Sequence, residues 1–190
     1  MARIIFDTAA TLNGWIADDR GSLSWLFEVE GGTEPDPDLL PSGATVLVEG
    51  STTYEWMLRE EDLLAHPERW QQVFGPRPTF VFTSRDLPIP RGADVHLVSG
   101  EVRAVLPRLR EAAAGGDIWV VGGGDLAGQF LDADALDVIA LSIAPVALPA
   151  GAALLPRRVG ADRLRLVSAR AAGQFARLVY EVRHEGDCSS

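Results

Sequence analysis

Three short segments of this chain combine glycine, hydroxyl and guanidinium groups, which are the groups that bind phosphate in proteins. Each segment follows a short apolar run of the kind that forms a buried strand. The segments are Gly50-Ser51-Thr52-Thr53, Thr83-Ser84-Arg85 and Gly122-Gly123-Gly124-Asp125-Leu126. Free amides at a helix start attract anions, glycine lets a backbone approach a ligand closely, and a guanidinium adds charge-assisted hydrogen bonds. Together they indicate a nucleotide site, although Ser and Thr at a helix start are more often plain N-caps.

The triple glycine is the most informative of the three segments. It ends an apolar strand expected at 117–121 and opens a helical pattern that runs through Leu126, Phe130 and Leu131. It is not a P-loop, because that motif needs a lysine and all 17 basic residues here are arginine. A dinucleotide fingerprint fits only with Ala127 as its third small residue, and far from the start of the chain where that unit belongs. A tight turn without a ligand stays open as the alternative.

The composition predicts one globular domain. At 190 residues with 47% apolar content, the chain is long enough to bury a substantial core. The net charge of −10 argues against a nucleic-acid partner. No apolar run approaches a membrane span, and the first residues lead directly into a strand pattern.

Cysteine, histidine and lysine usage excludes several kinds of chemistry. Cys188 is alone, so no internal disulfide can form and a cytoplasmic setting is expected. The three histidines are scattered and have no metal-ligand spacing, so no metal is expected. Schiff-base chemistry requires a lysine amine, which this chain lacks.

The predicted elements alternate between strands and helices and close with a run of strands. Strands are expected at 3–9, 45–49, 79–83, 95–98, 117–121, 135–146, 163–170 and 175–184, and helices around 56–58, 62–74, 101–114 and 124–131. Pro107 weakens the helix at 101–114 or moves its start later. The mixed pattern of the last three strands predicts antiparallel pairing near a sheet edge. The fold class is therefore α/β, with a domain over 1–185 and a polar tail at 186–190.

The three segments line one cleft if the strands that precede them are parallel neighbours. Ligands in an open α/β sheet collect outside the carboxyl ends of the strands. Such a cleft suits a dinucleotide, with helix-start amides for the pyrophosphate and Arg85 for an extra phosphate on the adenosine ribose.

Several motifs fall in the order of a known family. They are Ile-Phe-Asp-Thr-Ala-Ala-Thr-Leu-Asn-Gly-Trp-Ile-Ala at 5–17, Gly-Ser-Leu-Ser-Trp-Leu at 21–26, Gly-Ser-Thr-Thr-Tyr at 50–54, Thr-Ser-Arg at 83–85, and the strand–Gly-Gly-Gly–helix unit. With these motifs the chain resembles bacterial dihydrofolate reductase-like proteins, which share a domain with the C-terminal reductase of bifunctional riboflavin biosynthesis enzymes. The resemblance covers nearly the whole chain.

The resemblance implies a mostly parallel sheet of about eight strands with flanking helices and an antiparallel C-terminal edge, often in a homodimer, and NADPH as cofactor. The reaction would transfer hydride to a C=N or C=O bond of a small pterin- or pyrimidine-like heterocycle. Gly50, Ser51, Thr52 and Thr53 would meet the pyrophosphate, Ser84 and Arg85 the 2′-phosphate, and Gly122, Gly123, Gly124, Asp125 and Leu126 the other side of the cofactor. A cis peptide is expected at Gly122-Gly123 or Gly123-Gly124.

Three positions depart from the family's pattern. Ser51 stands where an arginine is usual, which removes one charge-assisted phosphate contact and lowers cofactor affinity unless Arg59 or Arg85 compensates from elsewhere. Asn13 and Ser24 each replace an aspartate. These departures support an alternative, a non-catalytic nucleotide- or partner-binding module that retains the fold.

The residues that would act on the substrate are open. Reduction of an imine needs a proton as well as a hydride, and Asn13 can form hydrogen bonds but cannot act as an acid. Glu28, Glu30 and Asp36 are the nearby carboxylates, with solvated loop charges as the alternative interpretation, and water could supply the proton. Trp15 and Trp25 are candidate walls for a substrate ring, together with Asn13, although core packing explains the two aromatic residues equally well.

Overall fold

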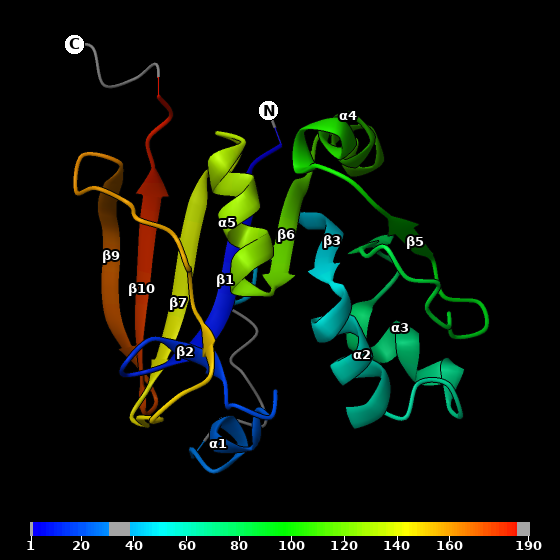
Figure 1. The fold of residues 1–190 in the computed structure, drawn as a ribbon, viewed down its shortest axis with the longest axis horizontal. Helices are drawn as coiled ribbons and strands as arrows, with labels where there is room; N and C mark the ends of the chain where they lie inside the picture. The colour runs from blue at the N-terminus through cyan, green and yellow to red at the C-terminus, as the bar shows by residue number, and fades with distance from the viewer. Residues whose placement is uncertain (1, 31–38, 186–190) are drawn as a thin grey trace.

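A computed structural model gives the fold, and it describes residues 2–30 and 39–185. In these residues, eight strands form one sheet in the order β5-β4-β3-β6-β1-β7-β10-β9, and β2 and β8 form a two-stranded ribbon (Figure 1). The strands are β1 (Ile4–Thr11), β2 (Trp15–Ala17), β3 (Ala44–Gly50), β4 (Thr79–Phe82), β5 (Val95–Val98), β6 (Asp117–Gly122), β7 (Val138–Ala144), β8 (Ala152–Ala153), β9 (Leu164–Ala172) and β10 (Phe175–Val182).

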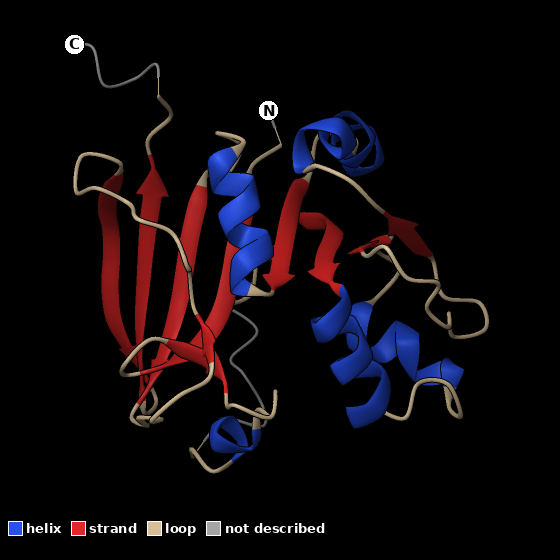
Figure 2. Ribbon diagram, viewed as in Figure 1, coloured by secondary structure: helices blue, strands red, loops and turns tan. Residues whose placement is uncertain are grey.

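Helices lie on both faces of the sheet and beyond the carboxyl ends of its parallel strands (Figure 2). They are α1 (Ser24–Phe27), α2 (Ser51–Glu60), the short 3₁₀ helix η2 (Pro67–Arg69), α3 (Trp70–Phe74), α4 (Val102–Ala113) and α5 (Gly124–Asp132). Among the described residues, no helix is both long and apolar enough to cross a bilayer.

The strand directions confirm the predicted fold class. The strands from β5 to β7 in the sheet order pair in parallel, whereas β10 is antiparallel to both β7 and β9. The carboxyl ends of β4, β3 and β6 are therefore neighbours at one edge of the sheet. This edge lies at the bottom of Figure 1, where α2 begins directly after β3 and α5 directly after β6.

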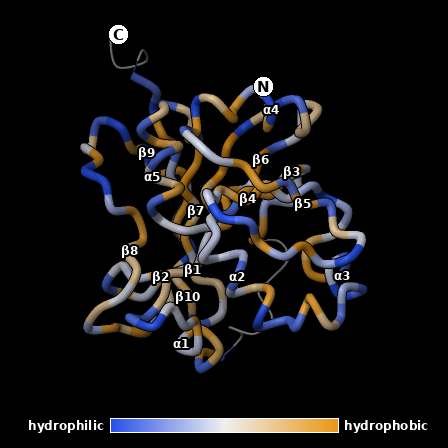
Figure 3. Tube along the Cα trace, turned by 45° about the vertical axis from the view of Figure 1, so that its right-hand side comes forward, coloured by the Kyte–Doolittle hydropathy of each residue, from blue (hydrophilic) through white to orange (hydrophobic). Residues whose placement is uncertain are grey.

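Side chains that alternate along each strand divide the core between two faces of the sheet. Along β6, Ile118 and Val120 pack in the cluster beneath α4 and α5, and Trp119 and Val121 pack against the cluster beneath α2 and α3. Apolar segments run through the middle of the molecule and hydrophilic ones through the outer loops (Figure 3). As a result, β6 carries a partly buried aromatic side chain, Trp119, in the strand that leads to the glycines.

Two expectations about the elements are wrong in part. Of the two alternatives for Pro107, the later helix start is wrong, because α4 starts at Val102 and keeps the proline inside it. The burial of Val102, Val105 and Leu109 on one face of α4 outweighs the hydrogen bond that Pro107 removes.

The strand expected at 135–146, β7, pairs antiparallel with β10 as predicted, but it also pairs in parallel with β1 and therefore lies inside the sheet, not at its edge. Its consecutive buried residues Ile139, Ala140 and Leu141 are typical of a strand that is covered on both faces.

Candidate functional site

The structure brings the three predicted phosphate-binding segments together. They follow β3, β4 and β6, which are adjacent and parallel. A Cβ atom placed on Gly50 would lie 3.7 Å from the amide nitrogen of Gly123, and one placed on Gly122 would lie 3.2 Å from the Thr53 hydroxyl. The start of α2 and the glycine turn therefore form one continuous surface.

The first turn of α2 offers backbone amides at this surface. Gly50 is the N-cap in an extended conformation, and no side chain caps the helix. The amides of the following residues have no partner within the helix, which is the usual state of a helix N-terminus. Ser51 and Thr53 are partly exposed and Thr52 is exposed, so their hydroxyls extend this group of donors.

The glycine turn contains one crowded position and one open position. A Cβ atom on Gly124 would lie 2.2 Å and 2.3 Å from the carbonyl oxygens of Ala153 and Leu154, whereas one on Gly123 would meet nothing within 4 Å. The Gly122-Gly123 peptide is cis, as the resemblance implied. Gly124 is thus needed for packing, and Gly123 leaves open space in front of the turn.

The two residues after the glycines differ in their surroundings. Asp125 accepts hydrogen bonds from Arg157 at 3.0 Å and from Gln129 at 2.9 Å, and these contacts lower the pKa of its carboxyl. Leu126 is buried in the core cluster beneath α5. Of the two, Asp125 is therefore the one with an exposed side chain.

Arg85 lies beyond the end of β4 and is paired with an acidic residue of α2. Its Nη2 and Nη1 atoms donate to the Oε2 and Oε1 atoms of Glu55 at 2.6 and 3.1 Å. Ser84, beside it, is exposed. The guanidinium predicted to bind a phosphate therefore already has a carboxylate partner.

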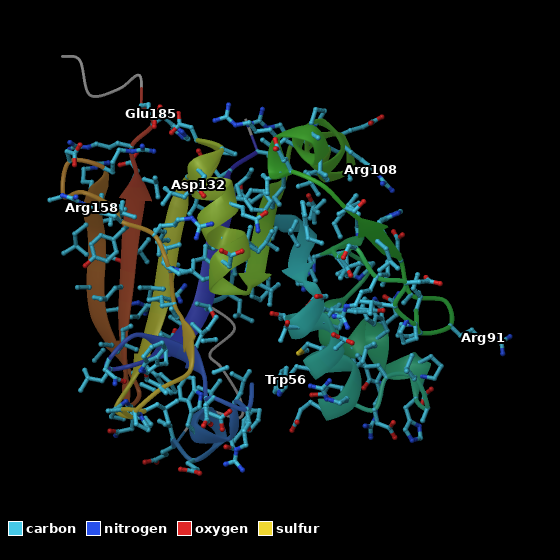
Figure 4. The ribbon with its side chains drawn as sticks, viewed as in Figure 1. Trp56, Arg91, Arg108, Asp132, Arg158 and Glu185 are labelled. Carbon is cyan, nitrogen blue, oxygen red and sulfur yellow. The ribbon has the colours of Figure 1, made fainter. Side chains whose placement is uncertain are left out.

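A cavity of about 450 Å³ lies on the face of the sheet that α2 covers. Apolar side chains form most of its walls, among them Phe27, Trp56, Trp119, Val121 and Phe175. Trp56 projects from α2 on the side of α1, where it stacks on Phe27 with ring centroids 6.3 Å apart (Figure 4). The size and the apolar walls are typical of a small-molecule site.

A buried ion pair supplies the polar part of this cavity. Arg177 on β10 donates from Nη1 and Nη2 to the two carboxylate oxygens of Asp7 on β1, at 2.7 and 2.6 Å. The same two nitrogens donate to Ser142 Oγ at 3.2 Å and to the Leu39 carbonyl at 2.6 Å. Asp7 and Arg177 are each only 5% exposed. Burial raises the pKa of the Asp7 carboxyl, and Arg177 offsets part of that rise.

The residues predicted to bind the substrate do not line this cavity. Asn13 accepts a hydrogen bond from Thr11 at 3.0 Å and exchanges two with the Leu148 backbone, at 2.6 and 3.1 Å. Trp15 belongs to β2, and Trp25 is buried in a small core cluster. Neither tryptophan is among the residues that line the cavity.

Of the three carboxylates near the predicted substrate site, Glu30 lines the cavity. Glu28 is an exposed residue at the end of α1, and it is not one of the lining residues. Asp36 lies outside the described residues. In the described ranges, no group of three or more His, Cys, Asp or Glu side chains lies close enough together to hold a metal ion.

One buried carboxyl lies directly before the segment at 50–53 that is predicted to bind phosphate. Glu49 on β3 is fully buried, and neither of its carboxyl oxygens has a hydrogen-bond partner. Burial raises the pKa of this carboxyl to about 8. Burial therefore favours the protonated, uncharged form of Glu49 in the folded protein.

Asp7, Arg177 and Glu49 were not identified from the sequence, although a signal was present. Each is a charged residue inside an apolar strand pattern, where a charge must be paired or neutralised. Trp119 lies within the strand already singled out, and its ring N–H donates to the Asp7 carbonyl oxygen at 3.0 Å.

Comparison with known proteins establishes the class of this fold. The chain matches the RibD C-terminal domain over residues 2–176, and it therefore belongs to that family. It is 30% identical over 173 residues to the uncharacterized protein YwjB of Bacillus subtilis (strain 168), covering 90% of this chain and 93% of that protein.

Solved structures agree with this family at the level of the fold. A putative riboflavin biosynthesis protein from Shewanella sp. PV-4 has a TM-score of 0.71 at 23% identity, covering 97% of this chain and all of that one (100%). A diaminohydroxyphosphoribosylaminopyrimidine deaminase/5-amino-6-(5-phosphoribosylamino)uracil reductase from Thermotoga maritima has a TM-score of 0.67 at 17% identity, covering 96% of this chain and 57% of that one.

Proposed function

We propose that this protein is an NADPH-dependent reductase that transfers hydride to a C=N or C=O bond of a small pterin- or pyrimidine-like heterocycle. One observation carries the proposal. Val121 lines the apolar cavity, and Gly122, the next residue, begins the glycine turn beside the α2 N-terminus. A cofactor held along that turn would lie next to a molecule bound in the cavity.

The residues present fit this cofactor. Residues 50–53 offer amides and hydroxyls to a pyrophosphate, and Gly123 leaves open space on the opposite side. Ser51 provides no charge for the pyrophosphate, and Arg85 would bind the 2′-phosphate. Asp125 would extend the far wall, whereas the buried Leu126 side chain packs in the core. When bound, NADPH would supply the hydride, and the protein would supply binding and orientation.

The names of the matched proteins support the substrate class. The Thermotoga protein is named as a reductase of a substituted uracil, and the Shewanella protein is named for riboflavin biosynthesis. The apolar and aromatic walls of the cavity suit a flat ring of that kind.

A non-catalytic binding module is the second candidate, and the surroundings of Asn13 favour it. Both polar groups of that side chain are used to hold the Thr11 turn and the Leu148 backbone. At this position the chain therefore has a structural amide in place of the family's acid.

We also propose that the protein forms a homodimer, as the family resemblance implies. The exposed edge strand β9, with Leu166 and Val167 54% and 59% exposed, is the surface that a second copy would cover. The chain mass is 20.4 kDa, and sedimentation should give a species of twice this mass. A single species with the mass of one chain would contradict the proposal.

Titration of the purified protein with NADPH and NADH, followed by nicotinamide fluorescence, tests the reductase proposal. Saturable binding of NADPH is the expected result. Absence of saturable binding of both nucleotides would rule out the reductase function, whereas a preference for NADH would remove only the role given to Arg85.

A further inference from the structure

The ion pair in the cavity leaves hydrogen-bond acceptors free but few donors. Each terminal nitrogen of Arg177 carries two N–H groups, and these four groups have four partners: two Asp7 oxygens, the Ser142 hydroxyl and the Leu39 carbonyl. The Asp7 oxygens each receive one of these hydrogen bonds and retain a further lone pair. A ligand that reaches this pair therefore meets a carboxylate that can still accept hydrogen bonds.

The charge of the cavity disfavours an anionic ligand. Its described lining holds two acidic residues, Asp7 and Glu30, and one basic residue, Arg177, which Asp7 already neutralises. A phosphate placed there would meet net negative charge in apolar surroundings, where an unpaired charge is costly. The Thermotoga protein is named for a substrate that carries a phosphoribosylamino group, and a site for that substrate must accept a phosphate. The charge of this cavity disfavours such a group.

We propose that this cavity binds an unphosphorylated, neutral or cationic aromatic heterocycle whose N–H groups donate to Asp7. Trp56, Trp119 and Phe27 would contact the ring, and the Asp7–Arg177 pair would select its orientation. The inference rests on the proposed function, because the bound ring would be the hydride acceptor. It adds a substrate class, amino- or lactam-bearing rings without phosphate, and a specificity-determining residue, Asp7.

Fluorescence of the cavity tryptophans provides the test, without any nicotinamide nucleotide in the solution. The probes are 2,4-diaminopyrimidine, 2,4-dimethoxypyrimidine, which keeps the ring but has no N–H donors, cytidine, and cytidine 5′-monophosphate. The diamino ring should bind saturably and at least about tenfold more tightly than the dimethoxy ring, since a hydrogen bond to a charged group is a strong one. Cytidine should bind more tightly than its monophosphate.

Two variants assign the effect to Asp7. Asp7→Asn should abolish the preference for the diamino ring. Asp117→Asn should retain it, because that aspartate forms a similar pair with Arg3 at the opposite end of the sheet, with Nη2 and Oδ2 2.6 Å apart. If Asp7→Asn does not fold, the comparison of the four probes on the wild-type protein decides the matter alone.

The results that would overturn this inference differ from those that would overturn the reductase proposal. Equal affinity for the two pyrimidines, no binding of the diamino ring at millimolar concentration, or tighter binding of the monophosphate than of cytidine would each overturn this inference. NADPH titration would be unaffected by these failures. Conversely, ring binding with the predicted preference but without NADPH binding would contradict the reductase and leave the ring site in place.

Discussion

Arg85 and Glu55 form a two-pronged ion pair between the end of β4 and the first turns of α2, with nitrogen–oxygen distances of 2.6 and 3.1 Å. The two side chains are 54% and 31% exposed. An ion pair this exposed contributes little to stability, about 0–1 kcal/mol. It can therefore open for a phosphate, but Glu55 competes with that phosphate for the same guanidinium.

Replacement of Glu55 should change the choice between the two nicotinamide nucleotides. Glu55→Gln removes both the competing carboxylate and its repulsion of a 2′-phosphate, so NADPH affinity should rise by about threefold or more, with NADH affinity unchanged. Fluorescence titrations measure both affinities. Glu181→Gln is the matched control, because it breaks an ion pair with Arg165 on β9. An unchanged ratio of NADPH to NADH affinity in Glu55→Gln would show that Arg85 does not meet the 2′-phosphate.

Glu49 should make the stability of the protein fall as pH rises. Its pKa is about 8 in the folded state against 4.5 for an exposed carboxyl, so between these values the folded protein holds a proton that the unfolded chain has released. Raising the pH through this window therefore favours unfolding, and the loss is complete above about pH 8. At about 1.4 kcal/mol per pKa unit, the effect amounts to a few kcal/mol.

Urea unfolding at about pH 6 and about pH 9 measures this dependence. Glu49→Gln should gain stability relative to the wild type at the higher pH, whereas Glu60→Gln, an exposed position on α2, should behave like the wild type. An identical pH profile for Glu49→Gln and the wild type would refute the account.

An added methyl group should lower stability at Gly124 but affect only NADPH binding at Gly123. Gly124→Ala forces a Cβ atom to within 2.2 Å of the Ala153 carbonyl oxygen, so it should destabilise the protein by about 1–3 kcal/mol or more. Gly123→Ala meets nothing within 4 Å and should leave unfolding unchanged. It should nevertheless weaken NADPH binding by about tenfold, because the methyl group fills the space that the backbone offers to the cofactor. Full NADPH affinity in a stable Gly123→Ala variant would be inconsistent with a cofactor along this turn.

Replacement of one partner of the Asp7–Arg177 pair should destabilise the protein strongly, whereas replacement of both by apolar residues should lower its stability much less. Asp7→Asn leaves a buried guanidinium without its counter-charge, and the expected loss is about 3–5 kcal/mol. Asp7→Leu combined with Arg177→Met removes both charges and should recover most of that loss. Chemical unfolding of the variants tests this. A double variant that loses as much stability as the two single replacements together would argue against coupling across β1 and β10.

The sequence was sufficient to predict the parallel sheet and the meeting of the segments at 50–53, 83–85 and 122–126 at one edge of it, because both depend on local patterns. Gly50 and Gly122 follow short apolar strands, and parallel neighbours bring such strand ends together. In the glycine turn the backbone must approach other groups closely, and the glycines themselves indicate this.

The cavity could not be predicted in the same way, since its polar residues are far apart in the chain. Asp7 and Arg177 meet only because β1 and β10 flank β7, and this order depends on the whole sheet. The sequence leaves Trp25 open between a substrate wall and core packing, because spacing alone does not decide between them. The structure supports core packing, since Trp25 lies on α1 with its ring buried beside Val29 and Ala144.

A crystal structure with NADPH bound would test the central claim most directly. The account predicts a pyrophosphate at the amides of residues 50–53 opposite Gly123, the 2′-phosphate at Arg85 in place of Glu55, and the nicotinamide ring facing the cavity beside Val121. A nucleotide bound elsewhere on the molecule, or a nicotinamide ring turned away from that cavity, would contradict it.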